Sequence, residues 1–430
     1  MQRHRRFIAI AVVFAAVATP LAASAATAGQ RAGVTISFME AMASGTQKPT
    51  LDDLTRNFEQ THPGISINLI AEPNYGVLQQ KEQASIAAGN PPTIGQAYEN
   101  WAAAYADAKA IVPLDNYVNS KKVGVPKTFR SNIWKGVWND LFLPDGKIWM
   151  WPFNKSDYVL FYNANMLKAA GLSVPTTWAR YATAEKKLTT GGDWGESLDT
   201  GTLSAPANGT LEYLSIVRAF GGTWIKNGKP TLDTKAAVQA LQFLDDLKAH
   251  GALQVGTNYP EQTALGAGRS AFAVSSIAGY PYMLAAAGGK FNMQVAPLPA
   301  GPNGGQGNAM AGTNIVIFAN ASTAQRAAAW QFMKYLSSPH ATAYWAIKTG
   351  YLPVTKSALV YMKKYIATHP YQKIAAQALQ YAGGNPPYAW WTQAEGDVAE
   401  AMQAVLDNGA SPASALATAQ QKAMQAASNP

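Results

Sequence analysis

Residues 34–69, VTISFMEAMASGTQKPTLDDLTRNFEQTHPGISINL, decide the fold class of this chain. The stretch opens with an apolar run that predicts a strand. Leu51, Leu54 and Phe58 then follow with helical spacing, and a His-Pro-Gly breaker ends the predicted helix. Apolar residues alternate over 65–69, which predicts a second strand. Strand, helix and strand in succession indicate an α/β unit.

The same alternation continues along the chain. A helix is predicted over 75–88 and a short strand over 94–98. The pattern restarts with the strand sequence YVLFY at 158–162, and an amphipathic helix follows over 234–249. Helices dominate from residue 324 onward. We therefore expect an α/β fold with a largely parallel sheet.

Composition narrows the class of protein. The chain has 430 residues, enough for two or three domains, and only 14% of them are charged. It contains no cysteine, which excludes disulfides, cysteine metal sites and a lipoprotein anchor. The net charge is +9, yet no stripe of Lys and Arg of the kind that binds nucleic acid is present. A small share of charged residues, with more basic than acidic ones, also suits an acidic habitat.

Residues 1–28 have the pattern of a signal peptide. Arg3, Arg5 and Arg6 precede an apolar run over 7–18, which is too short to span a bilayer. Small residues then offer A-x-A cleavage sites. An N-terminal membrane anchor is the alternative, and the short run disfavours it. We expect an exported, cleaved protein without a lipid anchor, located in the periplasm.

Catalytic and metal chemistry find little support in the residues. The histidines outside the first 28 residues lie far apart, so no metal site is expected. No glycine-rich stretch matches a nucleotide fingerprint, and no cofactor is expected. Pairs of nearby carboxylates are Asp52 with Asp53, Asp245 with Asp246, and Glu395 with Asp397. Nothing singles out one pair as a glycosidase pair, so an exported carbohydrate hydrolase stays as an alternative from another class.

Three tryptophans are candidates for ligand contact. Trp151, Trp390 and Trp391 lie near Gly, Pro, Asn and Asp and outside long apolar helical patterns. Aromatic faces beside short polar side chains suit sugars, because the rings stack on C–H faces while polar groups bind hydroxyls. The alternative for each tryptophan is ordinary core packing.

Eight short segments, spread over nearly the whole chain after residue 28, form a recognisable set. They are AGNPPTI at 88–94, YE at 98–99, IVPLD at 111–115, WPFNKS at 151–156, LFYN at 160–163, PTTW at 175–178, GRSAF at 268–272 and KTGYLPVTK at 348–356. In this order and spacing they resemble the solute-binding proteins of ABC importers, in the carbohydrate-binding group. Within that group, Pro152-Phe153-Asn154 and residues 349–353 look most like the proteins that bind glycerol 3-phosphate and glycerophosphodiesters.

The resemblance implies a two-lobed periplasmic-binding-protein fold with a hinge and a ligand cleft between the lobes. It implies that lobe one is 29–155 plus 313–348 and that lobe two is 156–312 plus 349–430. The chain crossings are expected near Phe153–Tyr158, Gly312–Ile315 and Thr349–Thr355.

The resemblance also implies the ligand contacts. These are Tyr75, Glu99, Ser156, Ser276, Gly312 and Tyr351, to which the aromatic argument adds Trp151, Trp390 and Trp391. One departure bears on the ligand. The proteins that bind glycerol 3-phosphate and glycerophosphodiesters carry an Arg for the phosphate in the C-terminal region, whereas residues 390–398 contain neither Arg nor Lys and include Glu395 and Asp397. A phosphate would lose its main charge-assisted hydrogen bonds there.

The expected function is therefore capture of a sugar, polyol or related small carbohydrate and its delivery to a membrane permease. Glycerol 3-phosphate or a glycerophosphodiester is the alternative ligand within the same class. The resemblance implies no catalysis, no cofactor and no nucleic-acid partner, and the protein is expected to be a monomer.

Overall fold

A five-stranded sheet forms the first half of the structure. The computed structural model describes residues 33–200 and 208–428. The strand order is β2-β1-β3-β13-β4. The strands are β1 (Val34–Glu40), β2 (Ile65–Ala71), β3 (Ile94–Ala97), β4 (Trp151–Pro152) and β13 (Asn314–Ile317). β1 is parallel to β2 and β3, whereas β13 is antiparallel to both of its neighbours.

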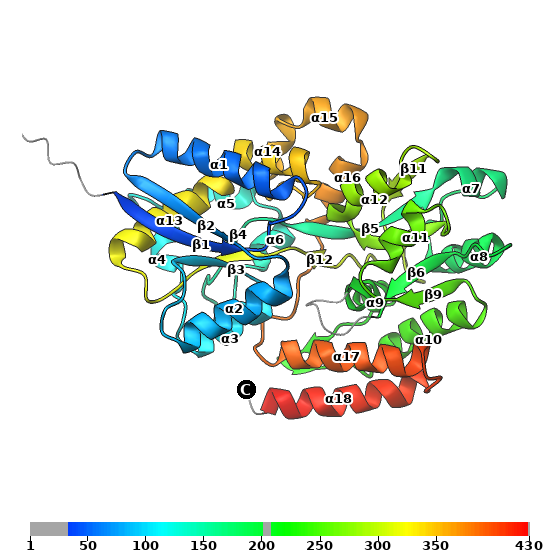
Figure 1. The fold of residues 1–430 in the computed structure, drawn as a ribbon. Coiled ribbons are helices and arrows are strands. Elements are labelled where there is room, and N and C mark those ends of the chain that lie inside the picture. The colour runs from blue at the N-terminus through cyan, green and yellow to red at the C-terminus, as the bar shows by residue number, and fades with distance from the viewer. Residues whose placement is uncertain (1–32, 201–207, 429–430) are drawn as a thin grey trace, which may run out of the picture. The chain divides into compact units, whose positions relative to one another are not determined.

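Helices cover both faces of this sheet. α1 and α13 pack on one face, and α2 and α3 pack on the other (Figure 1). The helices of this part are α1 (Gln47–Thr61), α2 (Tyr75–Ala87), α3 (Glu99–Asp107), α4 (Asp115–Val118), α5 (Lys127–Asn132), α6 (Lys135–Asn139), α13 (Thr323–Leu336) and α14 (Pro339–Thr349). The leucines and the phenylalanine that predicted the first helix are its buried face.

A second sheet is built around one long strand, β5. β10 and β11 flank it, and the short β12 also pairs with it; every one of these pairings is antiparallel. Its strands are β5 (Ser156–Asn163), β10 (Phe272–Ser276), β11 (Met293–Ala296) and β12 (Met310–Ala311). The expectation of a largely parallel sheet is therefore wrong for this second sheet, because the segments that return to β5 run against it. The smaller pairs are β6 (Glu196–Asp199) with β9 (Leu253–Gly256) and β7 (Ile225–Lys226) with β8 (Lys229–Pro230).

The remaining helices surround the second sheet or join the two parts. They are α7 (Ala164–Ala169), α8 (Trp178–Leu188), α9 (Asn208–Ala219), α10 (Lys235–Ala249), α11 (Pro260–Gly266), α12 (Tyr280–Ala287), α15 (Lys363–Thr368), α16 (Tyr371–Ala378), α17 (Trp391–Leu406) and α18 (Pro412–Ser428). α17 and α18 pack closely against each other and against α10. Figure 1 shows this pair beneath the second sheet, next to α9 and α10.

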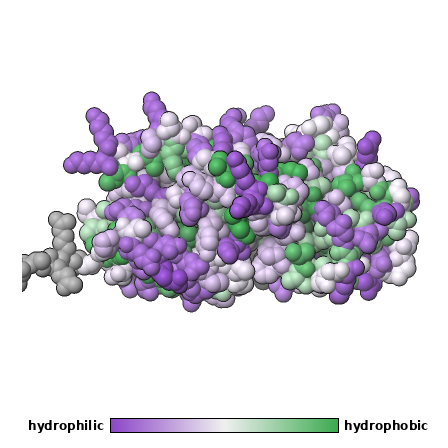
Figure 2. Space-filling model, turned by 90° about the horizontal axis from the view of Figure 1, so that it is seen from above, coloured by the Kyte–Doolittle hydropathy of each residue, from purple (hydrophilic) through white to green (hydrophobic). Residues whose placement is uncertain are grey.

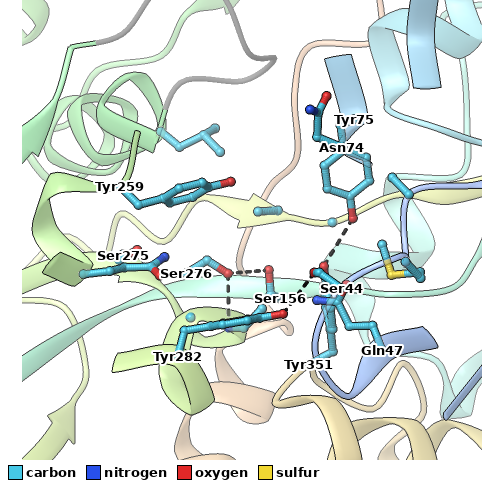
Figure 3. A pocket seen from close by; sticks show the side chains of 18 of the residues that line it. Ser44, Gln47, Asn74, Tyr75, Ser156, Tyr259, Ser275, Ser276, Tyr282 and Tyr351 are labelled. Carbon is cyan, nitrogen blue, oxygen red and sulfur yellow. Dashed lines mark hydrogen bonds between the residues drawn. The ribbon is translucent and has the colours of Figure 1, made fainter. Parts of the chain in front are cut away.

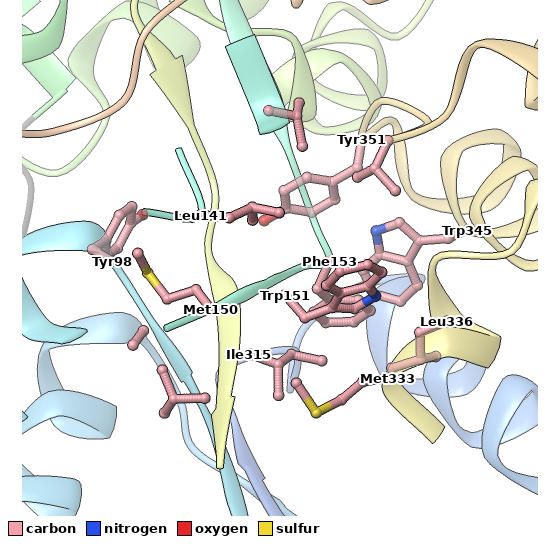
Figure 4. Close-up of a cluster of buried hydrophobic side chains, with 14 of the residues drawn as sticks. Tyr98, Leu141, Met150, Trp151, Phe153, Ile315, Met333, Leu336, Trp345 and Tyr351 are labelled. Atoms are coloured by element: carbon pink, nitrogen blue, oxygen red, sulfur yellow. The ribbon is translucent and has the colours of Figure 1, made fainter. Parts of the chain in front are cut away.

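Two large hydrophobic cores stabilise the fold: one lies on the first sheet and continues onto one face of the second sheet at Phe161 and Ala273, and the other covers the opposite face of the second sheet. The core of the first sheet includes Phe38, Trp151, Ile315 and Trp330, all at most 1% exposed, and Figure 4 shows its aromatic centre. The core of the second sheet joins residues of β5 to α8, α9, α10 and α17. Burial on this scale is the main source of stability, since each large side chain removed from water contributes about 1.5–3 kcal/mol.

The chain passes between the two sheets at stretches that lie side by side. Residues 153–155 lead from β4 of the first sheet into β5 of the second, and residues 312–313 lead from β12 back to β13. The stretch around Leu352 lies beside the first of these, because Leu352 forms an antiparallel bridge with Lys155. These stretches coincide with the three crossings expected from the sequence. The lobe boundaries themselves stay a prediction.

The surface of the protein is mostly hydrophilic on the face seen in Figure 2. Hydrophilic side chains are widely spread on this face, and hydrophobic residues form small groups between them (Figure 2). Within residues 33–200 and 208–428, no helix has the length and apolar character needed to cross a bilayer. The expected signal peptide, residues 1–28, lies outside the described residues.

Candidate ligand-binding site

A cavity of about 460 Å³ lies where the two sheets face each other. Its volume is within the range of about 300–1,000 Å³ that small-molecule sites occupy. The residues that line it are Ala41, Met42, Ser44, Gln47, Pro73, Asn74, Tyr75, Tyr98, Ser156, Leu211, Asn258, Tyr259, Gln262, Ser275, Ser276, Ala278, Gly279, Tyr282, Ala311, Gly312 and Tyr351. They come from loops and element ends of both parts of the fold (Figure 3). We call this cavity the cleft pocket.

One wall of the cleft pocket is a chain of hydrogen bonds between phenols and amides. The hydroxyl oxygens of Tyr75 and Tyr351 lie 3.2 Å apart, and Asn154 Nδ2 donates to Tyr75 at 2.7 Å. Asn154 Oδ1 in turn accepts from Gln96 and Thr313. The second-layer amides therefore fix the orientation of the two phenols, which is how a polar site is held ready for a ligand.

The start of β5 and the end of β10 supply hydroxyls to the same cavity. Ser276 Oγ donates to Ser156 Oγ at 2.8 Å, and both side chains line the cavity. Ser276 is also the cap of the 3₁₀ turn η1 (Ile277–Gly279), since its side chain accepts from the Ala278 amide. Hydroxyls held in this way can donate to or accept from a solute hydroxyl.

Two tyrosines from the second part of the fold, Tyr259 and Tyr282, also line the cleft pocket. Tyr259 has positive φ of 60°, as does its neighbour Asn258 at 63°, and non-glycine residues in this region concentrate at functional sites. Tyr282 of α12 reaches across, and its hydroxyl lies 3.2 Å from Ser44 Oγ. Figure 3 shows Tyr259 and Tyr282 on opposite sides of the two serines. Gly45 permits this approach, because a Cβ there would lie 2.9 Å from the Tyr282 hydroxyl.

The cleft pocket is polar but uncharged. Among the described residues that line it, none has a charged side chain. Burial raises the pKa of Tyr75 and Tyr98 well above the usual value and that of Tyr351 to about 12. These phenols are therefore protonated at neutral pH and act as neutral donors and acceptors. The chemistry suits a ligand that is rich in hydroxyl groups and carries no net charge.

Five of the predicted contacts meet in this cavity. Tyr75, Ser156, Ser276, Gly312 and Tyr351 all line it. They come from a helix start, two strand ends and two crossing stretches, so the fold brings together residues that are up to 276 positions apart.

Glu99 does not line the cleft pocket. It is 2% exposed, and its Oε1 accepts from Lys155 Nζ at 3.1 Å and from Asn314 at 3.1 Å. The Asn385 amide donates to Oε2 at 3.2 Å. Both oxygens are thus engaged within the protein. The fully buried Lys155 thus pairs with the carboxylate that was expected from the sequence to contact the ligand.

A second carboxylate completes this charged group. Lys155 Nζ lies 2.6 Å from Asp140 Oδ2 and 3.3 Å from the Gly312 carbonyl. Burial and the neighbouring Asp140 raise the pKa of Glu99. Burial opposes ionisation of Asp140 as well, but the Lys155 ammonium and the hydrogen bonds outweigh it and hold its pKa below the usual value. We call Glu99, Asp140 and Lys155 the crossing triad.

The tryptophans lie away from the cleft pocket. Trp151 is 0% exposed; its Nε1 donates to Ser337 and its ring packs on Trp330 at 4.8 Å (Figure 4). Trp391 is also 0% exposed and packs on Trp224. Neither ring has a face free for a solute. Trp151 and Trp391 are therefore ordinary core residues and not ligand contacts.

Trp390 lies at a different cavity. Its ring, 8% exposed, stacks on Tyr388 with centroids 5.2 Å apart. Both rings line a cavity of about 480 Å³ together with Trp149. The cleft pocket and this cavity share no lining residue.

Tyr259 and Tyr282 were not among the contacts expected from the sequence. Tyr259 stands in Asn-Tyr-Pro and Tyr282 in Tyr-Pro-Tyr, each beside a proline at the start of a helix. An aromatic residue at such a junction is a usable signal, because helix starts next to a strand end face the cavities of α/β folds. Within the ranges that the structure describes, no group of three or more His, Cys, Asp or Glu residues is arranged to hold a metal ion.

Two α/β parts joined by several crossings, with a polar cavity where they meet, define a class of protein that encloses small solutes. Residues 53–370 match the family described as bacterial extracellular solute-binding protein, and the chain belongs to that family. The predicted fold class is thereby confirmed.

Relatives and solved structures agree with this assignment. The sn-glycerol-3-phosphate-binding periplasmic protein UgpB of Pectobacterium atrosepticum is 27% identical over 346 residues, 77% of this chain and 76% of the relative. UgpB from Mycobacterium tuberculosis, solved with glycerophosphocholine, has a TM-score of 0.81 at 22% identity and covers 92% of this chain and 99% of its own. The cyclic alpha-maltosyl-1,6-maltose binding protein of Arthrobacter globiformis has a TM-score of 0.79 at 21% identity and covers 93% and 100%.

Proposed function

We propose that this protein is the solute-binding component of an ABC importer and that it captures an uncharged sugar or polyol in the cleft pocket. The uncharged, hydroxyl-rich lining of the cavity carries this proposal. Tyr75, Ser156, Ser276 and Tyr351 are the proposed hydrogen-bonding contacts, and Tyr259 and Tyr282 offer aromatic surface to the solute. The protein binds and releases its solute unchanged and hands it to a membrane permease.

The charges around the cleft pocket argue against a phosphate ligand. Thr210, next to the lining residue Leu211, donates to Glu395 at 3.4 Å, so a buried carboxyl group lies close behind the wall. Burial raises the pKa of Glu395 to about 7. Lys155 is engaged with two carboxylates and Arg218 donates to two backbone carbonyls. The sequence of residues 201–207, GTLSAPA, adds no charged group.

Two lobes that close on the solute explain why the contacts come from both sheets. We propose that lobe one is 29–155 plus 313–348 and that lobe two is 156–312 plus 349–430. The crossings between them are the stretches that join the two sheets. Hinge closure then buries the solute and excludes water. The mature protein is proposed to start after residue 28 and to work as a monomer in the periplasm.

A thermal-shift panel tests the proposed ligand class. Neutral mono- and disaccharides and polyols are compared with glycerol 3-phosphate and glycerophosphocholine. A ligand that binds only the folded protein raises its unfolding temperature, so a shift with a neutral solute is expected. A shift with the phosphates alone would reverse the choice of ligand, and turnover of a sugar would point to a hydrolase.

A further inference from the structure

Three buried carboxyl groups lie together beneath the second sheet, and the proposed function does not use them. They are Glu185 of α8, Glu196 of β6 and Glu212 of α9, which we call the acid cluster. Their exposed fractions are 0%, 0% and 2%. Glutamates are almost never fully buried unless they are paired, so three in one place call for an explanation.

The hydrogen bonds of the acid cluster are incomplete. The Tyr181 hydroxyl donates to Glu196, and the Val274 amide donates to Glu196 Oε1 at 2.6 Å. The Tyr181 hydroxyl lies near both carboxyl groups and donates its one proton to Glu196, so neither oxygen of Glu185 has a hydrogen-bond partner among the described residues. A buried carboxylate in that position would carry a large desolvation cost.

Glu196 and Glu212 interact directly. Their carboxyl groups lie close enough for each to affect the pKa of the other, and Glu212 Oε1 has no hydrogen-bond partner among the described residues. Two carboxylates have only acceptors, so a hydrogen bond between them requires a proton on one of them. Like charges at this distance in a buried site also cannot both ionise readily.

Positive charge is scarce around the acid cluster. None of the ion pairs among the described residues involves any of its three members. The other titratable groups that face it are Tyr181 and the exposed Lys186 of α8, Tyr158 of β5, Asp199 of β6 and Glu261 of α11. Lys186 is the one cation among these. Burial raises the pKa of Glu185 and Glu212, and that of Glu196 to about 7.

We propose that the acid cluster is a proton-binding site, whose carboxyl groups carry protons in the folded protein at neutral pH, so that the fold is most stable in an acidic medium. Protonation supplies the missing donors and removes the charge repulsion, while the unfolded chain has no comparable site. The inference is independent of which solute the cleft pocket binds.

The acid cluster adjoins, along the chain, two residues that line the cleft pocket. Glu212 is the neighbour of Leu211, and Val274 precedes Ser275; both Leu211 and Ser275 line the cavity. The same wall continues to Glu261, whose Oε1 accepts from Ser275 at 3.0 Å. Loss of the protons therefore acts on a wall of the ligand site.

The direction of the pH effect follows from the raised pKa values. A carboxyl group whose pKa is higher in the folded state stabilises the fold fully below its unfolded pKa, and this contribution is lost as the pH rises through the folded pKa. The loss therefore begins above the usual glutamate pKa and, for Glu196, is complete above the folded pKa of about 7. Over this range, the unfolding equilibrium constant rises about tenfold per pH unit for each extra proton held by the folded protein.

The test is the unfolding temperature of the ligand-free protein between pH 5 and pH 8.5. The wild type should unfold at progressively lower temperature as the pH rises. Glu185→Gln keeps the shape of the side chain and cannot ionise, so it should unfold several degrees above the wild type at pH 8 and differ little at pH 5. Glu400→Gln, at an exposed position of α17, is the matched control and should follow the wild type.

Two results would overturn the proposal. One is a wild-type unfolding temperature that is constant or rises from pH 5 to pH 8.5. The other is stabilisation of the wild type by Ca²⁺ that Glu185→Gln abolishes, since ionised carboxylates would then hold a cation. Should Glu185→Gln fail to fold, Glu212→Gln takes its place. Calorimetric unfolding at pH 6.5 in two buffers of different ionisation enthalpy counts the protons released. Release of fewer protons by Glu212→Gln than by the wild type supports the site, and release of equal numbers excludes it.

Discussion

At the scale of single residues, the cleft pocket depends on phenol hydroxyls. Tyr351 faces Tyr75 across 3.2 Å, and both are buried enough to stay protonated. A neutral donor and acceptor of this kind recognises solute hydroxyls without selecting for charge. Specificity then comes from the positions that Asn154 and its partners impose on the rings.

Tyr351→Phe removes one hydroxyl and keeps the ring. We expect an affinity for the neutral solute about 5–10 times weaker, since a neutral hydrogen bond contributes about 1 kcal/mol. Tyr361→Phe, at a side chain that is 57% exposed, is the control and should leave affinity unchanged. Equal affinities in the two variants, measured by calorimetric titration, would remove Tyr351 from the site.

Lys155 is the residue on which the crossing triad depends. Lys155→Met leaves Glu99 and Asp140 buried together without a counter-charge, which should cost about 3–5 kcal/mol of unfolding free energy. The exposed Lys168→Met is the matched control. Urea unfolding at pH 7 measures both; equal free energies would mean that the triad adds nothing to stability.

At the scale of elements, the crossing stretches set the geometry of the site. Gly312 has φ of 80°, and a Cβ there would lie 1.8 Å from the Asn154 carbonyl oxygen. Only glycine lets β12 and the stretch after β4 lie this close. The contact also places the Gly312 carbonyl against Lys155, which couples the crossing triad to the cavity wall.

Gly312→Ala should therefore push the two crossing stretches apart. We expect a loss of solute affinity of more than tenfold and lower stability. Gly146→Ala is the matched control, because Gly146 has φ of 76° but no atom within 4 Å of its Cβ position. The two variants share the backbone strain and differ in the clash. Equal effects in thermal unfolding and titration would show that the close approach is unimportant.

Sequence patterns predicted the elements better than their pairing. Helical spacing and alternation located α1, β2 and β5 because local chemistry decides them. The antiparallel partners of β5 come from residues more than 100 positions away, and no local pattern encodes that choice. Glu99 shows the same limit at the site, since its pairing with Lys155 depends on a contact across 56 positions.

At the scale of the whole molecule, two hydrophobic cores provide stability and a shared polar cavity provides the binding site. The first core includes residues of both sheets, the second core supports the second sheet, and the cleft pocket is lined by residues of both parts. Solute binding is then expected to raise the unfolding temperature of both parts of the fold together. A calorimetric trace with a saturating neutral solute should show one sharper, later transition. A trace in which only part of the heat shifts would confine the solute to one sheet.

The most direct measurement is a calorimetric titration of the wild type and of Tyr351→Ala with the neutral solute that gives the largest thermal shift. The account predicts binding of one solute per chain by the wild type, nearly unchanged when the salt concentration rises, and at least tenfold weaker binding by the variant. Binding of glycerol 3-phosphate that weakens with salt, or a neutral solute that binds the variant as tightly as the wild type, would contradict an uncharged solute in the cleft pocket.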